Sequence, residues 1–179
     1  MSNDKARRAT TGREVRFGEE ELIVSKTDAQ GRITYCNDVF IRISGYTERE
    51  LLGAPHSLIR HPDMPRAVFK LMWDTIASGE ECFAYVINRA KSGDHYWVLA
   101  HVTPTLDASG RVVGYHSNRR APSRDAIDAA RDVYAQVLAA EEAQPSARLA
   151  LEAGEAALRA AIGRTGLSYP SLVFALGAA

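Results

Sequence analysis

The reactive side chains of this 179-residue chain belong to five histidines and two cysteines, and their spacing fits no common metal or nucleophile motif. Cys36 and Cys82 are too few for a disulfide framework or a zinc ribbon, and no two histidines form an H-E-x-x-H pair. The sequence also lacks a G-x-S-x-G elbow, a Walker phosphate loop and a G-x-G-x-x-G turn. We therefore expect neither an enzyme nor a metal site. The histidines are His56, His61, His95, His101 and His116.

Residues suited to binding gather around a proline-interrupted segment, residues 54–65. Pro55, Pro62 and Pro65 prevent a regular helix there. Asp63 is a suitable N-cap for the helix that follows, with Pro65 in its first turn. An irregular segment of this kind across the mouth of a sheet forms a pocket.

The elements around this segment predict an α+β domain with a five-stranded antiparallel sheet and short helices over one face. Two short strands joined by a turn come first, and several short helices follow, one of them opened by the capping box Thr47–Glu50. A longer helix carries Phe69 and Trp73 on its apolar face and ends at Gly79. Three turn-linked strands complete the sheet. The strands are expected at 22–24, 32–36, 82–90, 95–106 and 111–119.

Five segments of this domain resemble one family. The segments NDVFIRISGYTEREL, IRHPDMP, MW-x-T-I-x-x-G, NRAKSGDHYWV and GYHSNR stand in the order and spacing of PAS domains of the aerotaxis receptor type. The resemblance covers residues 20–121 and implies the PAS fold. Members of this family bind FAD non-covalently and report cellular redox state, so the resemblance implies a flavoprotein sensor for signal transduction in aerotaxis or chemotaxis.

The resemblance also implies which residues contact FAD. An amide side chain such as Asn88 can meet the polar edge of a flavin with both its oxygen and its NH₂ group. Arg60 is suited to the pyrophosphate, and Trp73 offers a flat surface for ring stacking. The positions implied for cofactor binding are Asn37, Arg60, His61, Asp63, Trp73 and Asn88.

Each of these residues also has a purely structural interpretation. Asp63 caps a helix in that case, His61 orders its loop, and Trp73 belongs to the core. Arg60 would pair with an internal carboxylate, and Asn88 with backbone at a strand end. Only the joint occurrence of these residues in one ordered pattern favours the cofactor role.

Related PAS domains bind haem b instead, and this alternative needs a neutral histidine as iron ligand. By this interpretation His56 and His61 are the candidates near the pocket. His56 also stands where blue-light LOV domains carry their reactive cysteine, so we expect no cysteinyl adduct. A cofactor-free interaction module is the third possibility, and it predicts a pocket filled by its own side chains.

Strand alternation predicts which side chains face the pocket. If Asn88 points inward, then Val86, Ala84 and Cys82 do so as well. On the next strand Tyr96, Val98, Ala100 and Val102 are expected to point inward, which leaves His95, Trp97, Leu99 and His101 on the outer face. An exposed Trp97 and Leu99 would be costly, so the C-terminal helices or a second copy are expected to cover this face.

The chain divides into a flexible leader at 1–19, the PAS sensor domain at 20–121 and a helical C-terminal extension at 122–179. Pro145 separates two helices of the extension, and the second is expected to end at Gly163. The apolar segment 167–176 must dock on this chain, on a second copy or on a partner.

Composition restricts the partners. The chain has 22 Lys+Arg and 22 Asp+Glu, hence a formal net charge of zero, and so no overall attraction to nucleic acid or anionic membranes. No apolar run approaches the roughly 18–20 residues that a membrane span needs. We expect a cytoplasmic homodimer that signals to a separate protein, a chemoreceptor or a kinase.

Overall fold

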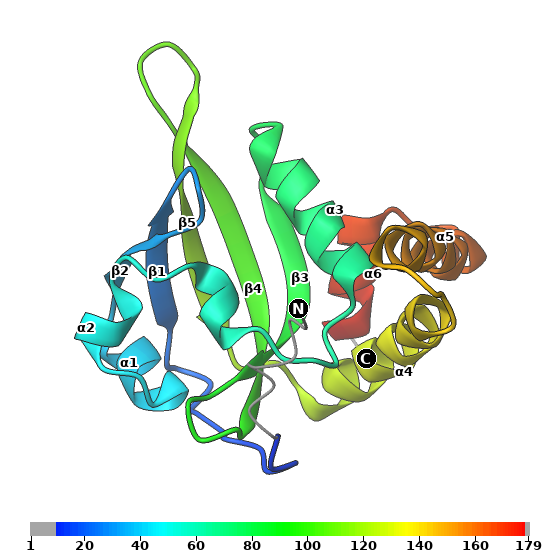
Figure 1. The fold of residues 1–179 in the computed structure, drawn as a ribbon, viewed down its shortest axis with the longest axis horizontal. Coiled ribbons are helices and arrows are strands. Elements are labelled where there is room, and N and C mark those ends of the chain that lie inside the picture. The colour runs from blue at the N-terminus through cyan, green and yellow to red at the C-terminus, as the bar shows by residue number, and fades with distance from the viewer. Residues whose placement is uncertain (1–9, 178–179) are drawn as a thin grey trace.

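A computed structural model describes residues 10–177, and its centre is one antiparallel sheet with the strand order β2-β1-β5-β4-β3 (Figure 1). The long pair β3 and β4 is in continuous register from Cys82 opposite Val102 to Arg89 opposite His95. Sequence order and sheet order differ because β5 returns to the middle of the sheet and pairs with β1. The strands are β1 (Ile23–Asp28), β2 (Ile33–Cys36), β3 (Cys82–Arg89), β4 (His95–Leu106) and β5 (Val112–Arg120).

Four short helical elements connect β2 to β3. Asn37 caps the first, and the expected capping box of Thr47 and Glu50 opens the second. The proline-interrupted segment forms one 3₁₀ turn, which ends before α3. In Figure 1 this turn and α3 stand on either side of a gap in front of the sheet. The elements are α1 (Asp38–Ser44), α2 (Glu48–Leu51), η1 (His56–Ile59) and α3 (Arg66–Ala77).

The start of α3 differs from the expectation. Asp63 was expected to cap this helix, but the helix begins at Arg66 and Pro65 occupies the N-cap position without a side-chain hydrogen bond. The prediction was wrong because Pro65 itself takes an extended conformation, with ψ of 141°, and so delays the first helical residue.

The extension forms three helices, α4 (Arg124–Glu142), α5 (Ala147–Thr165) and α6 (Tyr169–Gly177). The second of them continues through Gly163 and ends at Gly166, whose left-handed φ of 68° suits a glycine cap. The apolar segment 167–176 docks on this chain, because α6 packs against β3 and α4. In the part of the chain described, no helix is long and apolar enough to cross a membrane.

The C-terminal helices cover the outer face of the sheet, as strand alternation predicted. The ring of Trp97 stacks on Tyr134 of α4 with centroids 6.2 Å apart, and Phe83 contacts Phe174 of α6 at 4.8 Å. Tyr134 Oη donates a hydrogen bond of 2.5 Å to the carbonyl oxygen of Tyr85. The extension is therefore part of the same packed body as the sheet.

The described part of the leader is bound to the sheet rather than free. Val15 donates its backbone N–H to the His95 carbonyl oxygen at 2.7 Å, and Arg13 forms an ion pair of 2.6 Å with Asp94. Residues 1–9 of the expected flexible leader lie outside the described residues.

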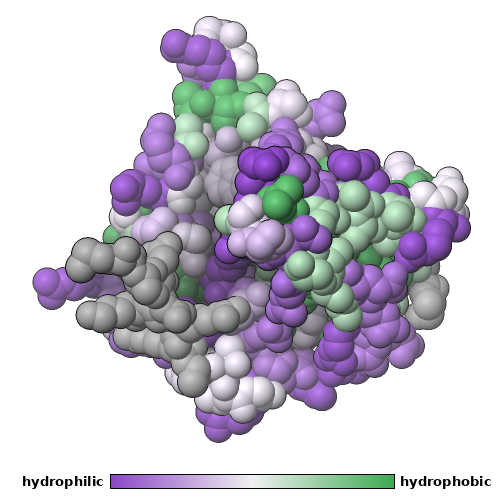
Figure 2. All heavy atoms as spheres, turned by 45° about the vertical axis from the view of Figure 1, so that its right-hand side comes forward, coloured by the Kyte–Doolittle hydropathy of each residue, from purple (hydrophilic) through white to green (hydrophobic). Residues whose placement is uncertain are grey.

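The far ends of β4 and β5 form an arm with exposed apolar side chains (Figure 2). Leu106 and Val113 lie on this arm.

Candidate functional site

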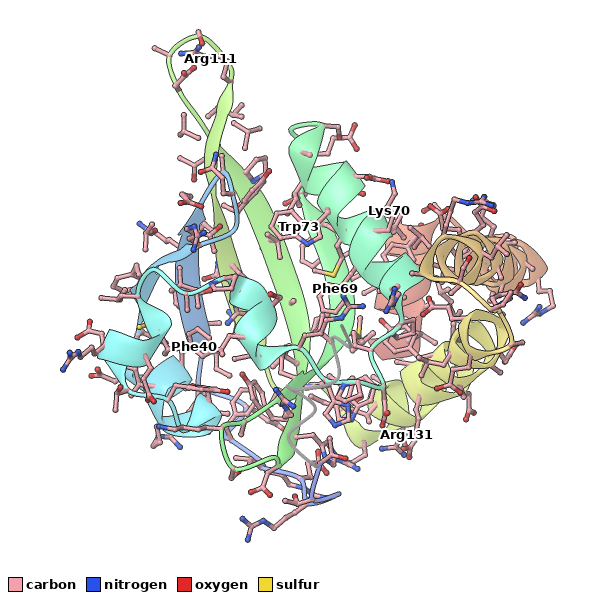
Figure 3. All side chains as sticks on the ribbon, viewed as in Figure 1. Phe40, Phe69, Lys70, Trp73, Arg111 and Arg131 are labelled. Carbon is pink, nitrogen blue, oxygen red and sulfur yellow. The ribbon has the colours of Figure 1, made fainter. Side chains whose placement is uncertain are left out.

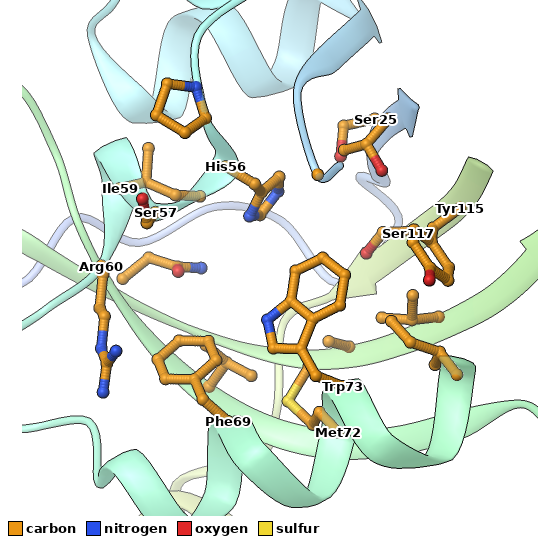
Figure 4. Close-up of a pocket in the computed structure, with 18 of the residues that line it drawn as sticks. Ser25, His56, Ser57, Ile59, Arg60, Phe69, Met72, Trp73, Tyr115 and Ser117 are labelled. Carbon is orange, nitrogen blue, oxygen red and sulfur yellow. The ribbon is translucent and has the colours of Figure 1, made fainter. Parts of the chain in front are cut away.

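A cavity of about 440 Å³ lies between the inner face of the sheet, η1 and α3 (Figure 4). Its floor consists of small apolar side chains from β3 and β4, and aromatic side chains from α3 and β5 form flat walls. Polar groups from β1, β3, β5 and η1 converge on it. The residues used below are Ser25, His56, Arg60, Phe69, Trp73, Val86, Asn88, Val98, Ala100, Tyr115, Ser117 and Arg119.

Trp73 forms the main aromatic wall. Phe69 and Trp73 project from α3 toward the sheet (Figure 3). The indole ring meets Tyr115 edge-on, with centroids 5.3 Å apart, and 40% of Trp73 remains exposed. Gly31 passes so close that a Cβ there would lie 3.0 Å from the indole. Trp73 therefore presents an open aromatic face to the cavity and is held in place along its edges.

Asn88 is a buried amide in the floor of the cavity. It is only 3% exposed, and its side chain forms no hydrogen bond with any residue between 10 and 177. A buried amide without a partner costs free energy on the order of 1–3 kcal/mol. A ligand with donor and acceptor atoms would satisfy it.

Arg119 places a buried positive charge beside the cavity. It is 2% exposed, donates to Ser25 Oγ, and lies over the Phe40 ring at 5.0 Å. No carboxylate of the described chain pairs with it, and its Nη1 has no hydrogen-bond partner. Burial lowers the pKa of Arg119 to about 10, so it stays charged at neutral pH. A buried positive charge favours a ligand that carries negative charge or hydrogen-bond acceptor atoms.

His56 is tied to this arginine. Arg119 Nη2 lies 2.7 Å from His56 Nε2, and because arginine only donates, Nε2 must be the acceptor. The proton of the neutral ring then sits on Nδ1. Burial, with a further contribution from Arg119, lowers the pKa of His56 to about 3. The partly buried imidazole is therefore neutral at physiological pH.

Tyr96 adds a second buried polar atom near Arg119. Its side chain is fully buried and its hydroxyl has no hydrogen-bond partner among the described residues. Burial raises the pKa of Tyr96, and the charge of Arg119 opposes that rise. The phenol is therefore neutral, and its buried hydroxyl does not line the cavity.

Four of the seven expected cofactor residues line the cavity. They come from three elements and one loop: His56 from η1, Arg60 from the loop after it, Trp73 from α3 and Asn88 from β3. The structural interpretation of Arg60 required an ion pair with an internal carboxylate, and Arg60 forms no such pair with the described residues. Instead its guanidinium lies over the Phe69 ring at 4.4 Å, and it contacts the Met64 carbonyl oxygen at 3.5 Å.

Asn37 lies outside the cavity and organises the fold. Its Oδ1 accepts from the backbone N–H groups of Val24 and Phe40, and its Nδ2 donates to the Leu22 carbonyl oxygen at 2.8 Å. These bonds fasten the start of α1 to β1. Its oxygen and its NH₂ group thus both bind backbone.

His61 and Asp63 also lie outside this cavity. The buried His61 ring accepts from the Asp63 backbone N–H at 3.1 Å and meets His95 edge-on, with centroids 5.8 Å apart. Burial lowers the pKa of His61, although the nearby Asp63 opposes that shift. The Asp63 side chain is exposed. This arrangement orders the loop, as the structural interpretation of His61 predicted.

A second, more open cleft adjoins the cavity. It lies between the η1–α3 loop and the α4–α5 loop, and it shares Ser57, Arg60 and Arg66 with the first cavity. Arg89 also lines it, whereas Glu141 supplies a carboxylate. The aromatic chamber thus shares wall residues with a cleft that carries three arginines and two carboxylates, those of Glu141 and Glu142.

Sequence reasoning missed the contribution of β5. Tyr115, Ser117 and Arg119 alternate along this strand and line the cavity together. The segment GYHSNR contains this period-two pattern, so strand alternation applied to β5 would have found all three. Ser25 on the neighbouring β1 has no comparable sequence signal.

Comparisons with known proteins identify the fold and its relatives. Residues 33–119 match the PAS fold family. The chain is 43% identical over 118 residues to the aerotaxis receptor of Escherichia coli (strain K12), which is 66% of this chain and 23% of the receptor. It is 31% identical over 102 residues to a nitrogen fixation regulatory protein of Klebsiella pneumoniae, covering 57% of this chain and 21% of that protein. The chain therefore spans about a quarter of the length of these relatives.

Among solved structures, the light state of the blue-light photoreceptor Aureochrome1 LOV is similar, with a TM-score of 0.55 and 25% identity. The similarity covers 62% of this chain and 88% of the LOV chain. The PAS match ends before α4, so the three C-terminal helices lie outside it.

Proposed function

Because residues 33–119 form a PAS domain similar to that of the aerotaxis receptor, we propose that this protein is a redox sensor that binds FAD non-covalently. The observation that carries the proposal is the buried Arg119, which lines the cavity without a carboxylate partner among the described residues. The amide of Asn88 lines the same cavity. A flavin ring offers a planar surface and a polar edge rich in acceptor atoms. The planar surface matches the aromatic walls of the cavity, and the polar edge matches its polar side chains.

The side chains of the cavity match the flat apolar faces and the polar edge of the flavin ring system. Trp73 and Phe69 supply flat apolar walls, and Val86, Val98 and Ala100 leave a smooth floor. Asn88 can bond the polar edge of the ring through either end of its amide. His56 can donate from Nδ1, because Arg119 already occupies its Nε2.

FAD also carries a pyrophosphate and an adenosine. The adjoining cleft supports their binding, because Arg60, Arg66 and Arg89 give it a basic lining. We propose that the pyrophosphate lies near Arg60, the arginine that lines both spaces together with Arg66. Asn37 and Asp63 then act by ordering the walls, whereas His61, which lines the adjoining cleft, can contact this part of the cofactor.

A bound flavin supplies reversible electron uptake, with a ring nitrogen that changes from acceptor to donor when reduced. Asn88 would respond by rotating its amide, since an unmatched buried polar pair costs on the order of 1–3 kcal/mol. Arg119 would favour the more negative, reduced form through its charge. The outer face of β3, where Tyr85 meets Tyr134 of α4, would pass the change to the extension.

We propose that the signal goes to a separate protein, a chemoreceptor or a kinase, and that the sensor works in the cytoplasm as a homodimer. Haem has less support than flavin here. Nε2 of His56 already accepts from Arg119, and His61 lies outside the cavity. The cofactor-free alternative predicts a filled pocket, whereas about 440 Å³ remains open.

The visible spectrum of the purified protein tests the proposal, together with chromatography of the released cofactor. We expect a yellow protein with two flavin absorption bands that releases FAD on denaturation. A Soret band would replace flavin with haem. A colourless protein that takes up neither added FAD nor haem would overturn the sensor proposal and leave an interaction module.

A further inference from the structure

Helix α3, which forms one wall of the cavity, lacks a cap of its own. The first backbone N–H groups of a helix have no partner within the helix and need an acceptor from elsewhere. Pro65 stands at the N-cap position of α3 and supplies no side-chain acceptor. No carboxylate occurs in the first turn either.

A carboxylate from the C-terminal extension takes this place. Glu141, in the last turn of α4, accepts the backbone N–H of Arg66 through Oε2 at 3.1 Å and that of Ala67 through Oε1 at 2.9 Å. Glu141 is only 6% exposed, although 74 residues separate it from Ala67. A buried carboxylate at a helix N-terminus gains both from hydrogen bonding and from the helix dipole.

The next helix closes over this carboxylate. A Cβ added to Gly154 of α5 would lie 2.5 Å from Glu141 Oε1, so only glycine permits this approach. The same helix places Leu151 on the rim of the cavity, and α5 packs against α3 (Figure 1). Glu141 is thus enclosed between the start of α3 and the middle of α5.

We propose that Glu141 is a positioning residue, through which the C-terminal helices hold α3 and hence the cavity wall formed by Phe69 and Trp73. The coupling is reciprocal by thermodynamic linkage: docking of α4 and α5 raises the affinity of the cavity for its ligand, and an occupied cavity stabilises the docked extension. That the ligand is FAD rests on the proposed function, whereas the support of α3 by Glu141 does not.

Hydrogen exchange on the full-length, cofactor-free protein tests the support of α3. Glu141→Ala is compared with Glu142→Ala, a matched change at the exposed neighbouring residue. We expect exchange over residues 66–77 to become about tenfold faster in Glu141→Ala only, a size typical of losing a helix cap. Equal exchange in the two variants would overturn the proposal.

Two further variants keep the test decisive if Glu141→Ala does not fold. Glu141→Gln retains one carbonyl acceptor and should give a smaller increase in exchange over the same residues. Gly154→Ala displaces the carboxylate from the α5 side, so it should also increase exchange in α3 although it lies outside that helix. If neither variant changes exchange over 66–77, Glu141 does not position α3.

The affinity for added FAD gives the second readout. For this readout the control is Asp132→Ala, a change at an exposed acid of α4 that lines neither the cavity nor the cleft. We expect the Kd of Glu141→Ala to rise about tenfold over that of Asp132→Ala, and FAD to slow exchange in α4 and α5 of the unmodified chain. If the unmodified chain binds no FAD, the proposed function fails, and the exchange comparison without cofactor still decides the role of Glu141. A tight FAD complex with equal Kd in both variants would contradict the coupling.

Discussion

Arg119 donates a hydrogen bond to Nε2 of His56 across 2.7 Å, although 63 residues separate the two in the chain. The bond joins the central strand β5 to the 3₁₀ turn η1 and fixes the tautomer of the imidazole. It also places a cation and a neutral ring donor at the same cavity. Two predictions follow from this pair.

His56 should make the fold sensitive to acid. Its pKa is about 3 in the folded chain against about 6.5 when unfolded, so between these values the unfolded chain binds a proton that the folded chain does not. Stability therefore falls as the pH drops through this window. Between pH 6.5 and 4.5, the free energy of unfolding of His56→Gln should fall by about 1–2 kcal/mol less than that of the unchanged protein, as measured by thermal unfolding. The glutamine keeps an acceptor for Arg119.

The carboxyls with depressed pKa values are present in both proteins, so their effect cancels in the comparison. The pKa values of Glu50, Asp94 and Asp107 are about 2. The two aspartates lose their contribution mainly below pH 4, and Glu50 begins to lose its contribution near pH 4.5. The same acid dependence in His56→Gln as in the unchanged protein would contradict a partly buried, neutral His56.

Arg119 should raise the reduction potential of the bound cofactor. Replacing it with glutamine removes a buried positive charge, so the midpoint potential in a spectroscopic redox titration should fall by roughly 30 mV, or about 1.4 kcal/mol for a two-electron couple. Arg120→Gln, at the exposed next position of β5, is the matched control. A potential that Arg119→Gln leaves unchanged would show that the charge does not face the ring.

Trp73 should contact the cofactor, whereas Trp97 should not. Trp73 lines the cavity, and Trp97 stacks on Tyr134 behind the sheet. Added FAD should therefore quench the tryptophan emission of Trp97→Phe more strongly than that of Trp73→Phe. Trp73→Ala should also bind FAD about fivefold to tenfold more weakly, because an aromatic contact is lost. Equal quenching in the two phenylalanine variants would contradict stacking on Trp73.

Tyr134 should hold the extension against the sheet. Tyr134→Phe removes the hydrogen bond to the Tyr85 carbonyl oxygen and leaves that buried oxygen without it. We expect a loss of about 1 kcal/mol, which corresponds to roughly 2–4 °C in Tm for a chain of this size. Tyr35→Phe, at an exposed tyrosine, should leave Tm unchanged. If both variants melt alike, the bond does not stabilise the docked helix.

The sequence by itself determined the elements and their faces. Period-two alternation assigned Val86 and Asn88 to the cavity and Trp97 to the covered face, because successive side chains of a strand point to opposite sides. The capping box at Thr47 was also readable, since both of its partners lie within one turn. The five motifs of residues 20–121 identified the PAS fold, which the comparisons confirm.

Only the tertiary structure decided which distant groups meet. Arg119 reaches His56 and Ser25 because β5 returns to the middle of the sheet beside β1, a pairing that no local pattern specifies. The cap of α3 was assigned to Asp63 from its place in the sequence, but Glu141 supplies it from 74 residues away. Local periodicity records which face of an element is apolar, whereas the partners of buried polar groups depend on how the elements pack together.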